Sequence, residues 1–90
     1  MKLSQLWQRG NGVAREVRLP NLGMNIAEAT VQEWLVSEGD AVTEGQDLVA
    51  VETDKVEAVL PSPMAGTVSQ IVAPAGETIP IGDVLALLED

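Results

Sequence analysis

The chain has 90 residues, a formal net charge of −9, and neither Cys nor His. Its length suits one small domain with a modest core, and its acidity argues against nucleic acid or an anionic membrane as a partner. Thiol nucleophiles, disulfides, most zinc sites and the commonest general base are excluded, so we expect neither a catalytic nor a metal site. No apolar run approaches the roughly 20 residues of a membrane span.

Residues 1–14 lie outside the pattern that organises the rest of the chain. Leu3, Leu6 and Trp7 have helical spacing, and Gly10-Asn11-Gly12 would end any helix. A docking helix is one interpretation. We favour a flexible N-terminal extension, with the domain proper formed by residues 15–90.

An internal repeat organises residues 15–90. A shift of 37 positions superimposes Thr30-Val31 on Thr67-Val68, Gly39 on Gly76, Gly45 on Gly82 and Glu52 on Glu89. Upstream, Leu19-Pro20 matches Leu60-Pro61 at a displacement of 41, which predicts four extra residues in the segment from Asn21 to Ala29. Two matched halves indicate two copies of one structural unit, packed face to face.

Each half has the pattern of four short strands. Segments rich in β-branched residues, 28–34 and 66–72, each precede a Gly–acid turn, a brief β segment, a second Gly and an apolar strand. The later expected strands are 41–43, 47–51, 56–60, 78–79 and 84–88. We assign the repeated glycines to turns or close strand contacts, and Trp34 to the core. The pattern predicts an all-β, flattened eight-stranded barrel or sandwich of two antiparallel four-stranded sheets with pseudo-twofold symmetry.

Lys55 is the only positively charged residue between Leu19 and Asp90. It lies at the junction of the two halves, so the pseudo-twofold places it at the end of the domain opposite the chain termini. Asp54-Lys55 between two strands predicts a hairpin turn, with Asp54 bonding its own backbone. A solvated lysine at such a tip is a poor nucleophile but a good attachment point for an activated acyl group. An ordinary surface lysine is the alternative.

At this point the sequence resembles a known family. Val51-Glu52-Thr53-Asp54-Lys55-Val56 is similar to the modification motif of lipoyl domains, the swinging-arm carriers in the acyltransferase component of 2-oxo acid dehydrogenase complexes. The flanking segments of residues 15–90 follow the family's order: Leu19-Pro20-Asn21-Leu22-Gly23-Met24, Glu33-Trp34-Leu35, Glu38-Gly39-Asp40-Ala41-Val42, Glu44-Gly45 and Ala65-Gly66-Thr67-Val68. The resemblance implies a flattened eight-stranded barrel, in agreement with the pattern above.

The resemblance also implies a function. Lys55 would carry lipoic acid in amide linkage, attached by a lipoate ligase or lipoyl transferase. The arm would take an acyl group from a thiamin-diphosphate-dependent decarboxylase, pass it to coenzyme A at the acyltransferase core, and be reoxidised by a flavin dihydrolipoyl dehydrogenase. The substrate would be a 2-oxo acid or acetoin. The domain itself would catalyse nothing.

Residues near Lys55 are candidates for recognition by the attaching enzyme and by partner subunits. Those in the motif are Glu52, Thr53, Asp54, Val56 and Glu57, although the acids have an alternative role in solvating a sheet edge. A second set lies in a loop that, in similar domains, is beside the modified turn and helps a decarboxylase to discriminate its carrier: Leu22, Gly23, Met24, Asn25 and Ile26. For Met24 and Ile26, ordinary core positions are equally open.

Two rival functions remain open. Biotin carrier domains share this barrel, but their modified lysine is usually flanked by Met, whereas Lys55 has Asp54 before it and Val56 after it. An unmodified interaction module with the same barrel is the other. As for localisation, we expect the cytoplasm of a bacterium or the mitochondrial matrix.

Overall fold

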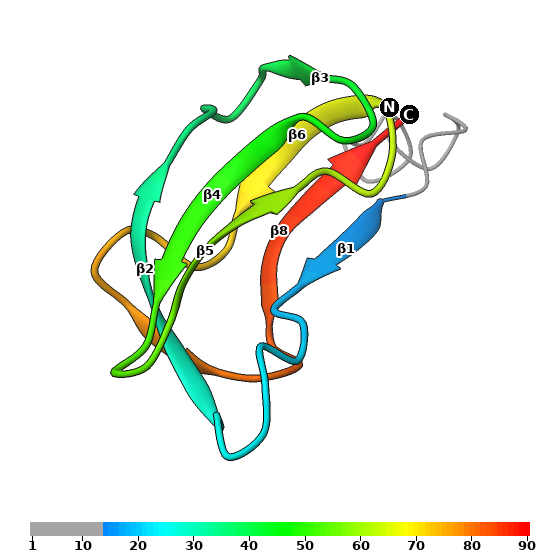
Figure 1. Ribbon diagram of the computed structural model, residues 1–90. Helices are drawn as coiled ribbons and strands as arrows, with labels where there is room; N and C mark the ends of the chain where they lie inside the picture. Colours follow the sequence, from blue (N-terminus) through cyan, green and yellow to red (C-terminus); the bar gives the residue numbers. More distant parts are fainter. Residues whose placement is uncertain (1–13) are drawn as a thin grey trace.

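A computed structural model describes residues 14–90, and these form eight β-strands (Figure 1). The strands are β1 (Arg15–Arg18), β2 (Glu28–Trp34), β3 (Ala41–Val42), β4 (Asp47–Glu52), β5 (Glu57–Pro61), β6 (Gly66–Ile71), β7 (Thr78–Pro80) and β8 (Val84–Glu89). This part of the chain contains no helix that could cross a membrane. The extension or docking helix expected over residues 1–14 lies outside the described residues, apart from Ala14.

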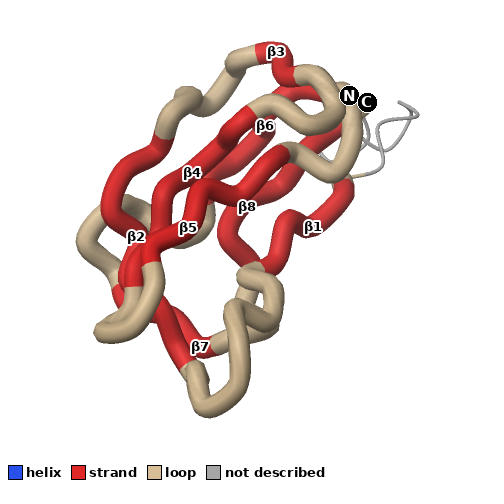
Figure 2. Tube along the Cα trace, viewed as in Figure 1, coloured by secondary structure: helices blue, strands red, loops and turns tan. Residues whose placement is uncertain are grey.

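The strands form two antiparallel sheets, ordered β1-β8-β6-β3 and β5-β4-β2-β7. The predicted fold class is confirmed, and Figure 2 shows the two layers one behind the other. The edge strands β1 and β5 do not pair with each other, so the barrel is not closed. Each sheet takes two strands from each half of the chain. The two copies are therefore interlocked rather than stacked as separate sheets. A sequence repeat determines the local conformation of each copy, but it does not determine which strands pair.

Strand pairing corrects the predicted register of the repeat. Arg15 pairs with Leu88 on β8, and Ala58 pairs with Val51 on β4. Since Leu88 and Val51 are 37 positions apart, β1 and β5 are related by a displacement of 43, and the first half carries six extra residues rather than four. The match of Leu19-Pro20 with Leu60-Pro61 at 41 positions is therefore fortuitous.

The core lies between the sheets and is aliphatic. Its largest fully buried side chains are Leu19, Leu48, Leu85, Leu88, Val31, Val49, Val51 and Val68. Burial of each such side chain stabilises the fold by about 1.5–3 kcal/mol before the entropy of ordering is subtracted. Trp34 packs against this cluster, as expected, and its indole Nε1–H donates to the Ala73 carbonyl at 2.7 Å.

The turns confirm the assignment of the glycines. Four of them, at equivalent places in the two halves, have positive φ: Gly39, Gly45, Gly76 and Gly82. Gly66 acts differently, because a Cβ there would lie only 2.4 Å from the Glu89 carbonyl oxygen of the neighbouring strand. Each turn reverses the chain where the strand pattern predicts it.

The β4–β5 turn lies at one end of the molecule. The start of β1 and the end of β8 meet at the other end, where Arg15 pairs with Leu88 (Figure 1). The lysine turn therefore lies opposite the point where the described domain begins and ends, as the pseudo-twofold predicts for residues 15–90.

Candidate functional site

Lys55 is exposed at the tip of the β4–β5 hairpin. Asp54 and Lys55 occupy the two central positions of the turn, between Thr53 and Val56. β5 begins at Glu57, one residue later than the strand predicted over 56–60. Four registered pairs bind β4 to β5 from Val49–Leu60 to Glu52–Glu57, so the turn stands on a continuous ladder. The lysine is thus presented by a rigid element rather than by a flexible loop.

Thr53 holds the turn together. Its amide donates to the Val56 carbonyl at 2.8 Å, and its Oγ1 accepts from the amides of Lys55 and Val56 at 3.0 and 2.9 Å. The hydroxyl also lies 3.4 Å from the Val56 carbonyl oxygen, to which it can donate. We expected Asp54 to bond its own backbone, but Thr53 takes that part. The signal was present in the sequence, because Thr hydroxyls bond amides two and three residues ahead.

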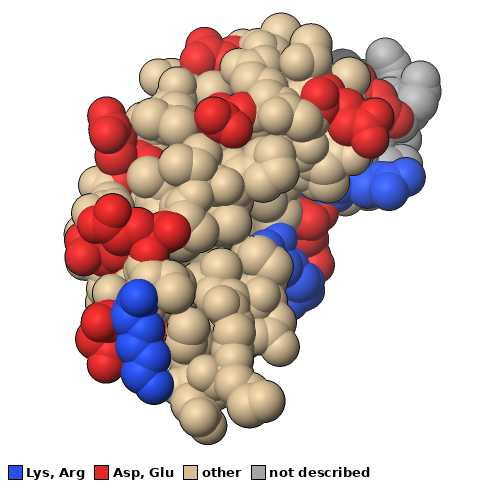
Figure 3. All heavy atoms as spheres, in the orientation of Figure 1, with Lys and Arg blue, Asp and Glu red and all other residues tan. Residues whose placement is uncertain are grey.

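The acidic residues of the motif surround the turn, but none of them forms an ion pair with Lys55 in the described part of the chain. Glu52 is half-buried, Asp54 and Glu57 are exposed, and Glu52 and Glu57 are direct cross-strand partners. Within residues 14–90 the ion pair that forms is Arg18–Glu16, away from this turn, so Lys55 is not paired with its acidic neighbours. Figure 3 shows one basic side chain among acidic ones at this end of the molecule.

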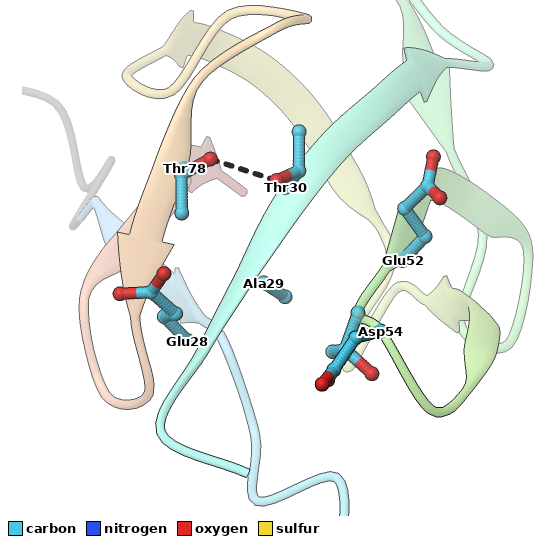
Figure 4. A pocket seen from close by; sticks show the side chains of 7 residues that line it. Glu28, Ala29, Thr30, Glu52, Asp54 and Thr78 are labelled. Atoms are coloured by element: carbon cyan, nitrogen blue, oxygen red, sulfur yellow. Dashed lines mark hydrogen bonds between the residues drawn. The ribbon is translucent and has the colours of Figure 1, made fainter.

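A shallow hollow of about 470 Å³ lies beside the lysine turn (Figure 4). Glu28 stands on one side, at the start of β2, and Glu52 and Asp54 stand on the other. Between them the hydroxyls of Thr30 and Thr78 are 2.7 Å apart. The hollow therefore joins the lysine turn to the point where the β1–β2 loop enters β2.

The sequence did not identify the residues of this hollow that come from β2 and β7. Glu28, Thr30 and Thr78 belong to segments predicted only as strands, and their proximity to Asp54 depends on the pairing of β2 with both β4 and β7. Within residues 14–90, no group of three or more acidic side chains is arranged to hold a metal ion.

The β1–β2 loop reaches the same end of the molecule as the lysine turn (Figure 1). Met24 at its tip is 87% exposed, which rules out the core position left open for it. Leu22 packs against the core, and Ile26 is half-buried outside the fully buried set. The loop is held by a side chain, since Asn21 Oδ1 accepts from the Gly23 amide at 2.9 Å.

The backbone of this loop requires particular residues. Gly23 has φ of +146° and Asn25 has φ of +65°, a left-handed conformation that Asn tolerates better than most residues. The Ile26 amide lies 3.4 Å from the Gly23 carbonyl, which closes the turn around Met24. The loop thus presents an exposed methionine from a defined backbone, at the end of the molecule that also carries the lysine turn.

Comparison with known proteins identifies the family. A family model described as "Biotin-requiring enzyme", for biotin- and lipoyl-attachment domains, matches residues 15–88. The chain therefore belongs to the biotin- and lipoyl-attachment family, a family of carrier domains, and is itself a non-catalytic carrier domain. The resemblance to lipoyl domains drawn from the sequence is confirmed.

Curated relatives are much longer than this chain. It is 40% identical over 79 residues to the dihydrolipoyllysine-residue acetyltransferase component of the pyruvate dehydrogenase complex of Corynebacterium glutamicum, covering 88% of the chain and 12% of that protein. It is 42% identical over 74 residues to the dihydrolipoyllysine-residue succinyltransferase component of the 2-oxoglutarate dehydrogenase complex of Bartonella vinsonii, covering 82% and 18%. The chain thus spans less than a fifth of the length of these relatives.

Solved structures agree with the fold. The lipoyl domain of the 2-oxoglutarate dehydrogenase complex of Azotobacter vinelandii superimposes with a TM-score of 0.69 at 31% identity, covering 83% of this chain and 95% of that domain. A single-chain, multi-domain long-chain acyl-CoA carboxylase gives a TM-score of 0.72 at 24% identity, over 98% of this chain and 8% of that one. The second likeness concerns the fold alone.

Proposed function

We propose that Lys55 carries lipoic acid in amide linkage and that the domain is the swinging-arm carrier of a 2-oxo acid or acetoin dehydrogenase complex. The observation that carries this proposal is an exposed lysine at a hairpin tip, within Glu52-Thr53-Asp54-Lys55, as the only cation between Leu19 and Asp90. Two of the relatives are acyltransferases named for a dihydrolipoyllysine residue, which supports lipoate over biotin.

The site suits such a group. An amide on the Lys55 amine leaves the turn intact, because the hydrogen bonds that hold the turn use Thr53 and backbone atoms. The attached dithiolane supplies the thiol chemistry for which this chain has no Cys. The protein contributes a rigid, exposed mount and an acidic surround. The mount keeps the arm at high effective concentration near each partner's active site.

The proposal includes defined partners. A lipoate ligase or lipoyl transferase would attach the group, and a thiamin-diphosphate-dependent decarboxylase, an acyltransferase core and a flavin dihydrolipoyl dehydrogenase would use it. Asp54 and the other motif residues would be read by the attaching enzyme. Leu22–Ile26, with Met24 exposed at the tip, would be read by the decarboxylase. A bacterial cytoplasm or mitochondrial matrix stays the predicted location.

Intact-mass measurement tests the attachment. Folded protein is incubated with ATP and lipoate plus a lipoate ligase, and in parallel with biotin plus a biotin ligase. We expect a single lipoyl addition that disappears in Lys55→Arg, with Arg18→Lys as a control that adds a lysine elsewhere on the surface. Addition of biotin alone would identify a biotin carrier, and no addition by either ligase would favour an unmodified interaction module.

A further inference from the structure

The hairpin that presents Lys55 is closed by two like charges. Glu52 and Glu57 are the last registered pair of β4 and β5 before the turn. Pairs alternate along an antiparallel ladder, and the hydrogen-bonded Thr53–Val56 contact makes Glu52–Glu57 the type in which side chains lie closest. Like charges directly opposite each other destabilise a hairpin. The strands should therefore tend to separate at the very position where the lysine must be held.

The contacts that oppose this separation converge on one residue. The Oγ1 of Thr53 accepts from the amides of Lys55 and Val56, at 3.0 and 2.9 Å, and its own amide donates to the Val56 carbonyl at 2.8 Å. The hydroxyl takes the place that a backbone carbonyl usually has in a two-residue hairpin, where it accepts the amide three residues ahead.

We infer that Thr53 is a positioning residue, which fixes the turn against the Glu52–Glu57 repulsion so that Lys55 is presented in one orientation to the attaching enzyme. The inference deepens, and rests on, the proposed modification of Lys55. Thr53 acts through the backbone of the turn and needs no contact with the enzyme. The acidic pair can then serve recognition without loosening the tip.

The decisive comparison is between Thr53→Val, which removes the hydroxyl but keeps the shape, and Thr53→Ser, which keeps the hydroxyl. We expect Thr53→Val to speed hydrogen exchange of the Lys55 and Val56 amides by roughly tenfold, the effect of losing one to two hydrogen bonds. Lipoate ligase should then show a lower kcat/KM, mainly through KM, in proportion to the fraction of molecules that still present the competent turn. Thr53→Ser should stay near wild type.

Two further variants separate positioning from a general loss of stability. Thr43→Val makes the same change in another turn, where the hydroxyl has only a 3.5 Å contact with Gln46, and should leave ligation unchanged. Glu57→Gln removes the repulsion, so in the Thr53→Val background it should restore part of the lost amide protection and of kcat/KM. The same Gln in the wild-type background corrects for any direct contact of Glu57 with the ligase.

The outcomes are distinct. Unchanged amide exchange in Thr53→Val, a normal ligation rate despite faster exchange, or a Thr53→Ser variant as impaired as Thr53→Val would each overturn the inference. Thermal denaturation checks folding, and Thr53→Ala replaces Thr53→Val should the latter not fold. If the wild-type protein accepts no lipoate, the proposed function fails, while the exchange measurement still decides whether Thr53 fixes the turn.

Discussion

The two connections that follow the equivalent strands β1 and β5 differ in length and in surface. Residues 19–27 join β1 to β2, and residues 62–65 join β5 to β6. Both begin alike, because Leu19 and Ser62 are buried and each exchanges two backbone hydrogen bonds with the turn that precedes β8 or β4. The longer one then projects Met24 into solvent, whereas the shorter one packs Met64 against the core. The same connection of the repeat is thus a short structural link in the second half and an exposed loop in the first half.

Shortening the long connection should have the largest effect. Deletion of residues 21–26 leaves three connecting residues, close to the length of the 62–65 connection. We expect ligation of Lys55 to persist, because the lysine turn is untouched, while acyl transfer from the decarboxylase falls by on the order of tenfold or more through loss of contact residues. Assays of ligation and of acylation on the same preparation check this. An unchanged acylation rate would show that the loop has no part in partner recognition.

Leu19→Ala tests the shared, buried start of the long connection. Leu19 is 1% exposed, and truncation of such a side chain should lower the free energy of unfolding by about 2–5 kcal/mol. Urea denaturation measures the loss. Leu35→Ala, at a leucine that is 45% exposed, is the matched control and should cost much less. Equal losses in the two variants would contradict the place given to Leu19 in the core.

Ser62→Ala tests the equivalent start of the short connection. The Ser62 hydroxyl is buried and donates to the Met64 carbonyl at 2.6 Å, so its removal should cost about 1–2 kcal/mol of unfolding free energy. The control is Ser69→Ala, whose exposed hydroxyl donates to the Leu87 carbonyl at 3.1 Å. A larger loss of unfolding free energy in Ser69→Ala than in Ser62→Ala, measured by urea denaturation, would contradict this prediction.

Met24→Ser should have the smallest effect on stability, and Met64→Ser provides the contrast. Met24, on the long connection, is 87% exposed, whereas Met64, on the short one, packs against the core. Met24→Ser should change the unfolding free energy by less than about 0.5 kcal/mol, and Met64→Ser should cost roughly 1–2 kcal/mol. Paired denaturation curves decide the point. A clear loss of stability in Met24→Ser would mean that the loop packs more closely than its exposure indicates.

Much of the fold could be predicted because the repeat and the alternating pattern are local features. The strand 28–34 was predicted with its observed bounds, and the turn glycines have the expected positive φ. The interlocked pairing could not be predicted, since two similar halves are equally compatible with stacking or exchange of strands. The displacement of 43 was hidden by the chance match of two Leu-Pro pairs.

Part of the candidate site could also be predicted from the sequence, and part could not. Lys55 was identified by its isolation in an acidic sequence. The exposure of Met24 could not be decided, because residues that have no counterpart in the other half carry no periodicity to read. The role of Thr53 could have been found from the spacing of its hydroxyl to the amides two and three residues ahead, whereas Asp54 is the more usual turn former. The hollow that includes Glu28 and Thr78 could not be predicted from the sequence, because it depends on how the strands of the sheet pair.

The adjacent ends of β1 and β8 have a consequence for how this unit can be attached. Because Arg15 pairs with Leu88, a polypeptide joined at either end of residues 15–90 is attached to the domain at one place. The lysine turn is separated from that place by the length of β4, roughly 20 Å for six residues. A tether attached there leaves the domain from the end opposite the lysine, so it can lengthen, stiffen or be duplicated without altering the lysine turn.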